Sequence, residues 1–153
     1  MSPSAPLLSP LEVARRSAAA MWAGDRASQG LGMELLDVGP GRATVRMTVS
    51  EEMVNGHAIG HGGFTFTLAD SAFAFACNSY NRSTVAAACE IRFLAPTRLG
   101  DELVARAVER SRTGRDGVYD VTVSVEDTVV AELVGRSKEI RGTLFDPEQP
   151  EEP

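Results

Sequence analysis

The sequence has few of the residues that build disulfide frameworks, zinc sites or nucleic-acid-binding faces. Its two cysteines, Cys77 and Cys89, lie in apolar segments and not in a CxxC or other ligand-spaced pattern, so we expect reduced core residues. Acidic residues outnumber basic ones by 21 to 15. This balance argues against a nucleic-acid partner, because phosphate binding needs a basic face. A polyanionic ligand would have to be met by a few local arginines.

Long hydrophobic runs are also missing. The longest apolar region, 64–77, is too short for a membrane-spanning helix and carries Asp70 in its middle, so we expect no membrane association. Residues 1–16 have no basic start followed by a long apolar core, which predicts no secretory signal and a cytoplasmic location. With 153 residues, of which 43% are hydrophobic, the chain fits one domain with an ordinary core.

The N-terminal part predicts a helix followed by a hairpin. Residues 1–8 are rich in Ser and Pro and are expected to be disordered. The SPLE sequence at 9–12 is a capping box with proline at the first helical position, which predicts a helix over 10–23. The segment 31–38, a GPGR turn and the alternating ATVRMTV at 43–49 predict two paired strands.

A polar, glycine-rich segment at 50–63 separates this hairpin from a longer region of helical spacing. We predict one helix over 63–80, ending at the turn-forming NSYNRS. The acidic, proline-containing tail 146–153 is expected to be disordered, which leaves one domain over 9–142. The chain after the long helix predicts four strands, within 84–96, 101–113, 117–127 and 128–142.

The order of these elements predicts an α+β fold. Because the C-terminal half lacks helices, it cannot form the alternating units of a doubly wound fold. The simplest architecture is an antiparallel sheet with the long helix packed on one face. Apolar or small residues surround nearly the whole helix, and one sheet covers it incompletely, so we expect a partner subunit to cover the rest.

One acid interrupts the apolar run of the predicted long helix. At 3.6 residues per turn, Asp70 shares its face with mostly apolar neighbours, namely Phe66, Thr67, Phe73, Ala74 and Cys77. A carboxylate so placed costs desolvation energy unless something binds it. Asp70 is therefore either a structural hydrogen-bond hub or a site carboxylate with a tuned pKa, and the residues alone leave both interpretations open.

The sequence GHGG leads directly into this helix. Backbone N–H groups near Gly62 and Gly63 lack partners at the positive end of the helix, where they can bind phosphate or polarise a carbonyl. Gly62 and Asp70 are eight residues apart, which is about 12 Å along one helix and too far for both to act on one carbonyl. If both are catalytic, they must come from two subunits whose helices run antiparallel across a twofold axis. The sequence therefore predicts an obligate dimer if this protein is an enzyme.

The only two histidines raise the question of a metal site. His57 and His61 are four residues apart, but the neighbouring glycines disfavour a regular helix, and no carboxylate stands at the spacing of the HExxH motif. We therefore predict no metal and no cofactor. His61 is expected to hold the loop or to hydrogen-bond near Asp70, and His57 to be exposed or to help shape the cleft.

The segment MVNGHAIGHGGFTFTLADSAFAFACNS, residues 53–79, resembles the signature of the PaaI-type hotdog-fold acyl-CoA thioesterases of phenylacetate degradation. FLAP, GDEL and GVYDVTV also resemble segments of that family, so the likeness covers about residues 30–142. It implies a hotdog fold, in which a curved antiparallel sheet of five to six strands wraps a long central helix. It also implies dimers that pair into tetramers.

The resemblance further implies roles for four residues in the hydrolysis of phenylacetyl-CoA or ring-hydroxylated phenylacetyl-CoA. Asp70 matches the catalytic carboxylate, Gly62 the backbone donor at the helix start, Asn55 the asparagine of the opposite wall, and His61 the histidine before that glycine. The Gly62 amide would stabilise the oxyanion. Asp70 of the neighbouring subunit would activate water as a general base or attack directly. Departures beside the motif, AI before GHGG and FTFT after it, leave the acyl specificity open.

The remaining candidates would bind other parts of an acyl-CoA substrate. Arg112 and Arg115, at a strand end and turn, can meet the CoA phosphates, although they can equally be solvated turn residues. Gly63 lies beside the backbone donor, and Phe66 and Phe73 can line the acyl pocket or belong to the core.

Two other functions of this fold are alternatives. A non-catalytic acyl-CoA-binding module fused to a DNA-binding unit is disfavoured, because about 30 non-basic residues precede the first strand and give no recognition domain. A hydratase or dehydratase normally depends on a differently placed histidine with an acid. Here the acid lies in the helix and the histidines in the loop, which favours hydrolysis.

Overall fold

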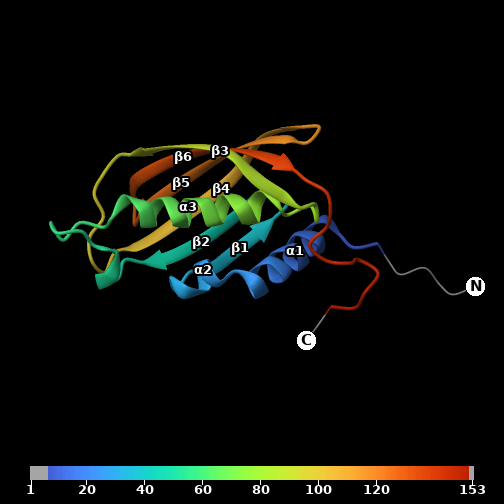
Figure 1. The fold of residues 1–153 in the computed structure, drawn as a ribbon, viewed down its shortest axis with the longest axis horizontal. Helices are drawn as coiled ribbons and strands as arrows, with labels where there is room; N and C mark the ends of the chain where they lie inside the picture. Colours follow the sequence, from blue (N-terminus) through green and yellow to red (C-terminus); the bar gives the residue numbers. More distant parts are fainter. Residues whose placement is uncertain (1–6, 152–153) are drawn as a thin grey trace, which may run out of the picture.

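The computed structural model describes residues 7–151, which form one antiparallel sheet with a long helix across its inner face (Figure 1). The six strands are ordered β1-β2-β4-β5-β6-β3. This is the predicted α+β arrangement. The elements are α1 (Pro10–Gly24), α2 (Arg26–Gly30), β1 (Glu34–Gly39), β2 (Arg42–Thr48), the 3-10 helix η1 (Glu51–Met53), α3 (Gly62–Cys77), β3 (Thr84–Phe93), β4 (Glu102–Thr113), β5 (Asp116–Val125) and β6 (Thr128–Glu139).

The N-terminal helices form from local capping signals. The predicted capping box is present: the Glu12 N–H donates to Ser9 Oγ at 3.2 Å and the Ser9 N–H to Glu12 Oε2 at 3.3 Å, and α1 ends one residue beyond the prediction. The short helix α2 was not predicted. Asp25 caps it by accepting hydrogen bonds from the Ser28 N–H and Oγ. No helix between residues 7 and 151 is long and apolar enough to cross a membrane.

The predicted long helix is confirmed, but it ends at Cys77 and not at Tyr80. The Asn78 backbone N–H donates to the Ala74 carbonyl. The Asn78 side chain accepts from the Thr84 N–H at 2.8 Å and donates to the Thr84 carbonyl at 3.0 Å. This side chain therefore reverses the chain and directs it into β3 before the helix can continue. The predicted hairpin and the four C-terminal strands are also confirmed.

The hydrophobic core lies between α3 and the inner face of the sheet. Phe73 is only 1% exposed, and its ring centroid lies 5.6 Å from that of Tyr119 in β5. Gly135 of β6 faces the same ring, and a Cβ at this position would come within 2.8 Å of it. The absence of a side chain at Gly135 therefore lets α3 lie close to β6.

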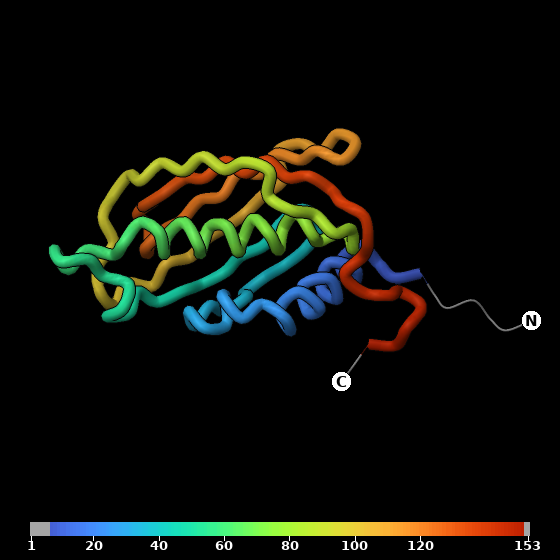
Figure 2. Tube along the Cα trace, viewed as in Figure 1, coloured from blue at the N-terminus to red at the C-terminus, as the bar shows by residue number. Residues whose placement is uncertain are grey.

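The chain after β6 packs beside α1 as a C-terminal strap, residues 143–151 (Figure 2). Asn81, in the left-handed region at φ 59°, accepts hydrogen bonds from the Leu144 and Phe145 N–H groups and donates to the Phe145 carbonyl. Arg16 of α1 lies 4.4 Å from the Phe145 ring centroid and donates to the Gln149 carbonyl. Disorder is predicted from the sequence for residues 1–8 and 146–153. Of these, residues 1–6 and 152–153 lie outside the described residues.

Candidate active site

One face of α3 points away from the sheet and is only partly covered within the protomer. Gly63 is exposed, and Phe66, Thr67, Asp70 and Ala74 are half-buried, at spacings that place them on one side of the helix. The remaining side of α3 packs on the sheet and is mostly buried. This partly covered stripe therefore has a carboxylate at its centre.

Asp70 has no hydrogen bond or ion pair to any side chain or backbone group among residues 7–151. Burial among apolar neighbours raises the pKa of its carboxyl above the usual range. Burial also raises the pKa of Cys89 in β3, and the charge of Asp70 adds a smaller effect in the same direction. The structural hydrogen-bond hub is therefore excluded within the described chain, which favours the other interpretation, a site carboxylate.

At the start of α3, His61 is the N-cap residue, and its Nδ1 accepts a hydrogen bond from the Gly63 N–H at 2.9 Å. The His61 N–H donates to the Met53 carbonyl at 2.7 Å. The Gly62 N–H has no partner in the described part of the chain. Of the two predicted glycine donors, only Gly62 is thus free to bind a ligand. His61 holds the loop, which was one of its two predicted roles.

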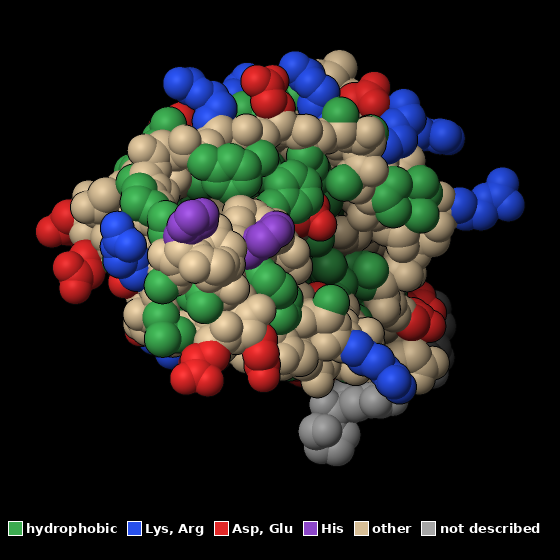
Figure 3. Space-filling view, turned by 60° about the vertical axis from the view of Figure 1, so that its left-hand side comes forward, with side chains coloured by type: hydrophobic (Ala, Val, Ile, Leu, Met, Phe, Trp, Pro, Cys, Tyr) green, Lys and Arg blue, Asp and Glu red, His purple; other side chains and the backbone are tan. Residues whose placement is uncertain are grey.

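The loop before the helix is organised by Asn55. Its Oδ1 accepts hydrogen bonds from the His57 N–H at 2.9 Å and the Ile59 N–H at 3.3 Å. The carbonyl oxygen of the Asn55 side chain is thus engaged within the loop. Both histidines lie on one face, beside hydrophobic side chains (Figure 3). Residues 7–151 contain no group of three or more His, Cys, Asp or Glu side chains that could hold a metal.

Gly62 and Asp70 lie in the same regular helix. Their separation of eight residues corresponds to about 12 Å along its axis. The structure therefore does not bring the predicted backbone donor and the predicted carboxylate together within one protomer.

Beside Gly62 the surface is hollowed by an apolar cavity of about 430 Å³, which we call the Gly62 cavity. Phe93, at the end of β3, forms one wall, and its ring would lie 3.1 Å from a Cβ at Gly62. Other residues around the cavity include Ile59, Thr65 and Val130. Sequence reasoning missed Phe93, because nothing in the FLAP segment indicates that its ring covers the helix start.

The two predicted pocket phenylalanines have different positions. Phe66 is half-buried on the stripe with Asp70. Phe73 lies in the core against Gly135 and Tyr119, with 1% of its surface exposed, so the structure does not bring it to the site.

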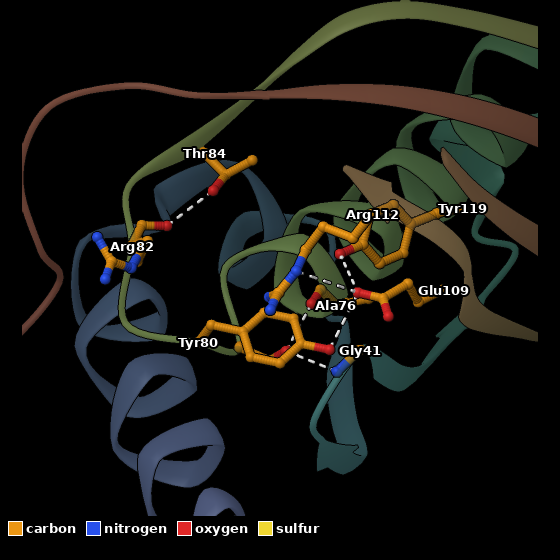
Figure 4. A network of polar contacts seen from close by, with 9 residues as sticks. Gly41, Ala76, Tyr80, Arg82, Thr84, Glu109, Arg112 and Tyr119 are labelled. Atoms are coloured by element: carbon orange, nitrogen blue, oxygen red, sulfur yellow. Dashed lines mark hydrogen bonds and ion pairs between the residues drawn. The ribbon is translucent and has the colours of Figure 1, made fainter. Parts of the chain in front are cut away.

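Arg112 and Arg115 line a second cavity, at the opposite end of α3 from Gly62. Sequence reasoning missed three residues here, Arg82, Tyr80 and Glu109 (Figure 4). Arg82 shares the cavity wall, and Tyr80 hydrogen-bonds Glu109. The signal in the sequence for this cavity is that NSYNRS at 78–83 and RSRTGR at 110–115 both contain turn-forming residues, but nothing in either segment indicates that the two turns meet.

Comparison with known proteins assigns this architecture to a family. A family model described as "Thioesterase superfamily" matches residues 57–132. The acyl-coenzyme A thioesterase PaaI of Escherichia coli (strain K12) is 43% identical over 130 residues, 84% of this chain and 93% of that protein.

Solved structures agree with this assignment. The E. coli PaaI protein from the phenylacetic acid degradation operon superposes with a TM-score of 0.86 at 42% identity, covering 88% of this chain and 99% of that one. A point mutant of the phenylacetic acid degradation protein PaaI from Thermus thermophilus has a TM-score of 0.74 at 35% identity, covering 76% of this chain and 100% of that one. The chain therefore belongs to the thioesterase superfamily, among the PaaI-type acyl-CoA thioesterases of the hotdog fold, and is a thioester hydrolase.

Proposed function

We propose that the protein hydrolyses phenylacetyl-CoA, or a ring-hydroxylated phenylacetyl-CoA, to the free acid and CoA. The observation that carries the proposal is Asp70, a half-buried carboxylate with a raised pKa and no partner in the described chain. The similarity to E. coli PaaI, a protein from the phenylacetic acid degradation operon, supports the proposed acyl class. A cytoplasmic location remains a prediction from the sequence.

The active site is shared between two subunits of a dimer. Gly62 of one subunit and Asp70 of its partner face the same thioester. Within one subunit these two residues are about 12 Å apart along the helix, which is too far for both to act on one carbonyl. Two features support this arrangement: the partly covered stripe on α3, and the edge strand β3, whose residues 86–88 are exposed. We further expect two dimers to form a tetramer.

Hydrolysis begins with polarisation of the thioester carbonyl. The free Gly62 N–H, at the positive end of α3, donates to the carbonyl oxygen and stabilises the negative charge that develops there. His61 keeps the helix start in place through its bond to the Gly63 N–H, so His61 and Gly63 act by positioning this donor. Asn55 fixes the loop and can present its side-chain amide N–H group to the substrate or to water.

Asp70 then attacks or activates water. As a general base, it takes a proton from water as the water oxygen bonds to the carbonyl carbon, and the CoA thiolate leaves. As a nucleophile, it forms a mixed anhydride that water cleaves in a second step. Single-turnover hydrolysis in heavy-oxygen water tests the second route: label in the Asp70 carboxylate indicates an anhydride that water cleaves at the Asp70 carbon. Label only in the acid product is expected from the general-base route, and also from attack of water on the acyl carbon of the anhydride.

The aryl group of the substrate binds in apolar surroundings next to the reacting carbonyl. The Gly62 cavity, with Phe93 at its wall, provides such surroundings beside the backbone donor, and Phe66 lies on the same helix face as Asp70. Aromatic pairs prefer offset or edge-to-face contact, which a phenylacetyl ring can form with either side chain.

The test is thiol release from phenylacetyl-CoA, benzoyl-CoA and a medium-chain acyl-CoA, followed with a thiol reagent. We expect the highest kcat/KM with phenylacetyl-CoA. Preference for the medium-chain substrate would overturn the acyl class, and absence of release from all three would overturn hydrolysis of CoA thioesters. Elution of the active protein as a monomer would overturn the shared site.

A further inference from the structure

The cavity at the C-terminal end of α3 is lined by three arginines, and we call it the arginine pocket. It measures about 340 Å³ and lies between the turn that follows α3 and the β4–β5 hairpin. Arg82 comes from the turn, and Arg112 and Arg115 come from the hairpin; Cys77 and Tyr119 also line it. Three guanidinium groups thus meet at one cavity in a protein of net charge −6.

The orientation of Arg112 is fixed by a polar network (Figure 4). Its guanidinium carbon lies 3.5 Å from the ring centroid of Tyr80, and its Nε lies 4.0 Å from Glu109 Oε1. The hydroxyl groups of Tyr80 and Tyr119 both donate to the same Glu109 oxygen, at 3.0 and 3.1 Å. A guanidinium held over an aromatic ring keeps its N–H edge available for a further acceptor.

The acidic groups of the pocket are already paired. Asp116 accepts from Lys138 at 3.0 Å, and Glu139 lies 3.5 Å from Arg82. Arg115 has no ion pair within residues 7–151. In the last turn of α3, the Ala74 and Ala76 carbonyls accept hydrogen bonds from the residues that follow the helix, which reduces their repulsion of an anion. The pocket therefore offers an unpaired guanidinium and two further arginines to an anionic ligand.

We propose that the arginine pocket binds the 3′-phosphate of coenzyme A, with Arg82 acting beside Arg112 and Arg115. Planar guanidinium groups match phosphate oxygens with paired hydrogen bonds. Cys77, in the pocket wall, is seven residues beyond Asp70, which is about 10 Å along α3. The extended phosphopantetheine arm is longer than this, so a thioester at Asp70 can place its nucleotide end in the pocket. This inference rests on the proposed function.

The test compares three thioesters of one acyl group: phenylacetyl-CoA, phenylacetyl-dephospho-CoA, which lacks only the 3′-phosphate, and phenylacetyl-N-acetylcysteamine, which lacks the nucleotide. For Arg115→Gln and Arg82→Gln we expect KM for phenylacetyl-CoA to rise about tenfold each with kcat unchanged, as for the loss of one charge-assisted hydrogen bond. KM for the other two thioesters should stay at the wild-type value. The matched control, Arg15→Gln, removes an exposed arginine of α1 and should change none of the three.

Two results would overturn the inference. An unchanged KM for phenylacetyl-CoA in both variants would show that the phosphate binds elsewhere. An equal rise in KM for the N-acetylcysteamine thioester would show that the substitutions act through the fold.

Failure of the proposed function is a separate result, because wild-type protein would then release thiol from none of the three. Calorimetry with CoA and dephospho-CoA tests the pocket without turnover. We expect about tenfold tighter binding of CoA, and loss of that difference in Arg115→Gln. Equal affinity of the wild type for both would overturn the site.

Discussion

Replacement of Asp70 by asparagine removes the charge of the proposed catalytic group while preserving its shape. The carboxylate has no hydrogen-bond partner in the described chain, so the substitution breaks no protein contact that the structure contains. Because an amide is neither a general base nor a nucleophile here, kcat should fall about 100-fold or more, the usual contribution of such a group. CoA binding should be retained, since Asp70 is not part of the arginine pocket.

The same substitution should not lower stability at neutral pH. Burial raises the folded-state pKa of Asp70 above the unfolded value of about 3.9. Between these two pKa values the folded state binds more protons than the unfolded state, so the wild type loses stability as the pH rises through this window. Asp70→Asn lacks this loss. The gain in free energy of unfolding of the variant over the wild type should be absent below about pH 3.9 and constant above the folded-state pKa of Asp70. This gain should be at most about 1 kcal/mol, because solvent reaches the side chain.

Two measurements check this reasoning. Thiol release from phenylacetyl-CoA gives kcat, and urea unfolding at fixed protein concentration gives the free energy of unfolding at pH 4 and pH 7. The control is Asp37→Asn, the same chemical change in an exposed carboxylate of β1, which should leave kcat unaltered. Unchanged thiol release in Asp70→Asn would refute the catalytic role. A lower free energy of unfolding at pH 7 would show that Asp70 makes a stabilising contact, contrary to the reasoning above.

Three further predictions concern the fold. Gly135→Ala places a Cβ 2.8 Å from the buried Phe73 ring, and urea unfolding should show a loss of about 1–3 kcal/mol. Asn81→Ala removes three hydrogen bonds to the C-terminal strap, so limited proteolysis should cleave the strap faster while the sheet stays intact. Burial raises the pKa of both tyrosines, Tyr80 and Tyr119, so the change in their ultraviolet absorbance should occur at higher pH in the folded than in the urea-unfolded protein. Stability should fall above the unfolded-state pKa of about 10, since folding favours the protonated phenols.

The elements that sequence predicted well have local causes. The capping box sets the start of α1, and alternation or helical spacing defines the strands and α3. The features that it missed join distant residues: Tyr80 bonds Glu109 across 29 positions, and Asn81 bonds Phe145 across 64. Helical spacing gives the angle between side chains but not which side meets the sheet. For that reason Phe73 was placed on the face of Asp70, although it belongs to the core.

The position of β3 also determines the order in which the chain can complete its fold. Within residues 7–151, strand β3 pairs with β6 alone, although β4 and β5 lie between them in the sequence. During synthesis, residues 84–93 therefore leave the ribosome well before 128–139, and both of their backbone edges stay unpaired in the meantime. Closure of this pair is a late, long-range step, which predicts slow folding for a domain of this size. Nascent chains halted before β6 would expose an alanine-rich strand that other chains can bind, so chaperones should recognise these intermediates and not the finished protein.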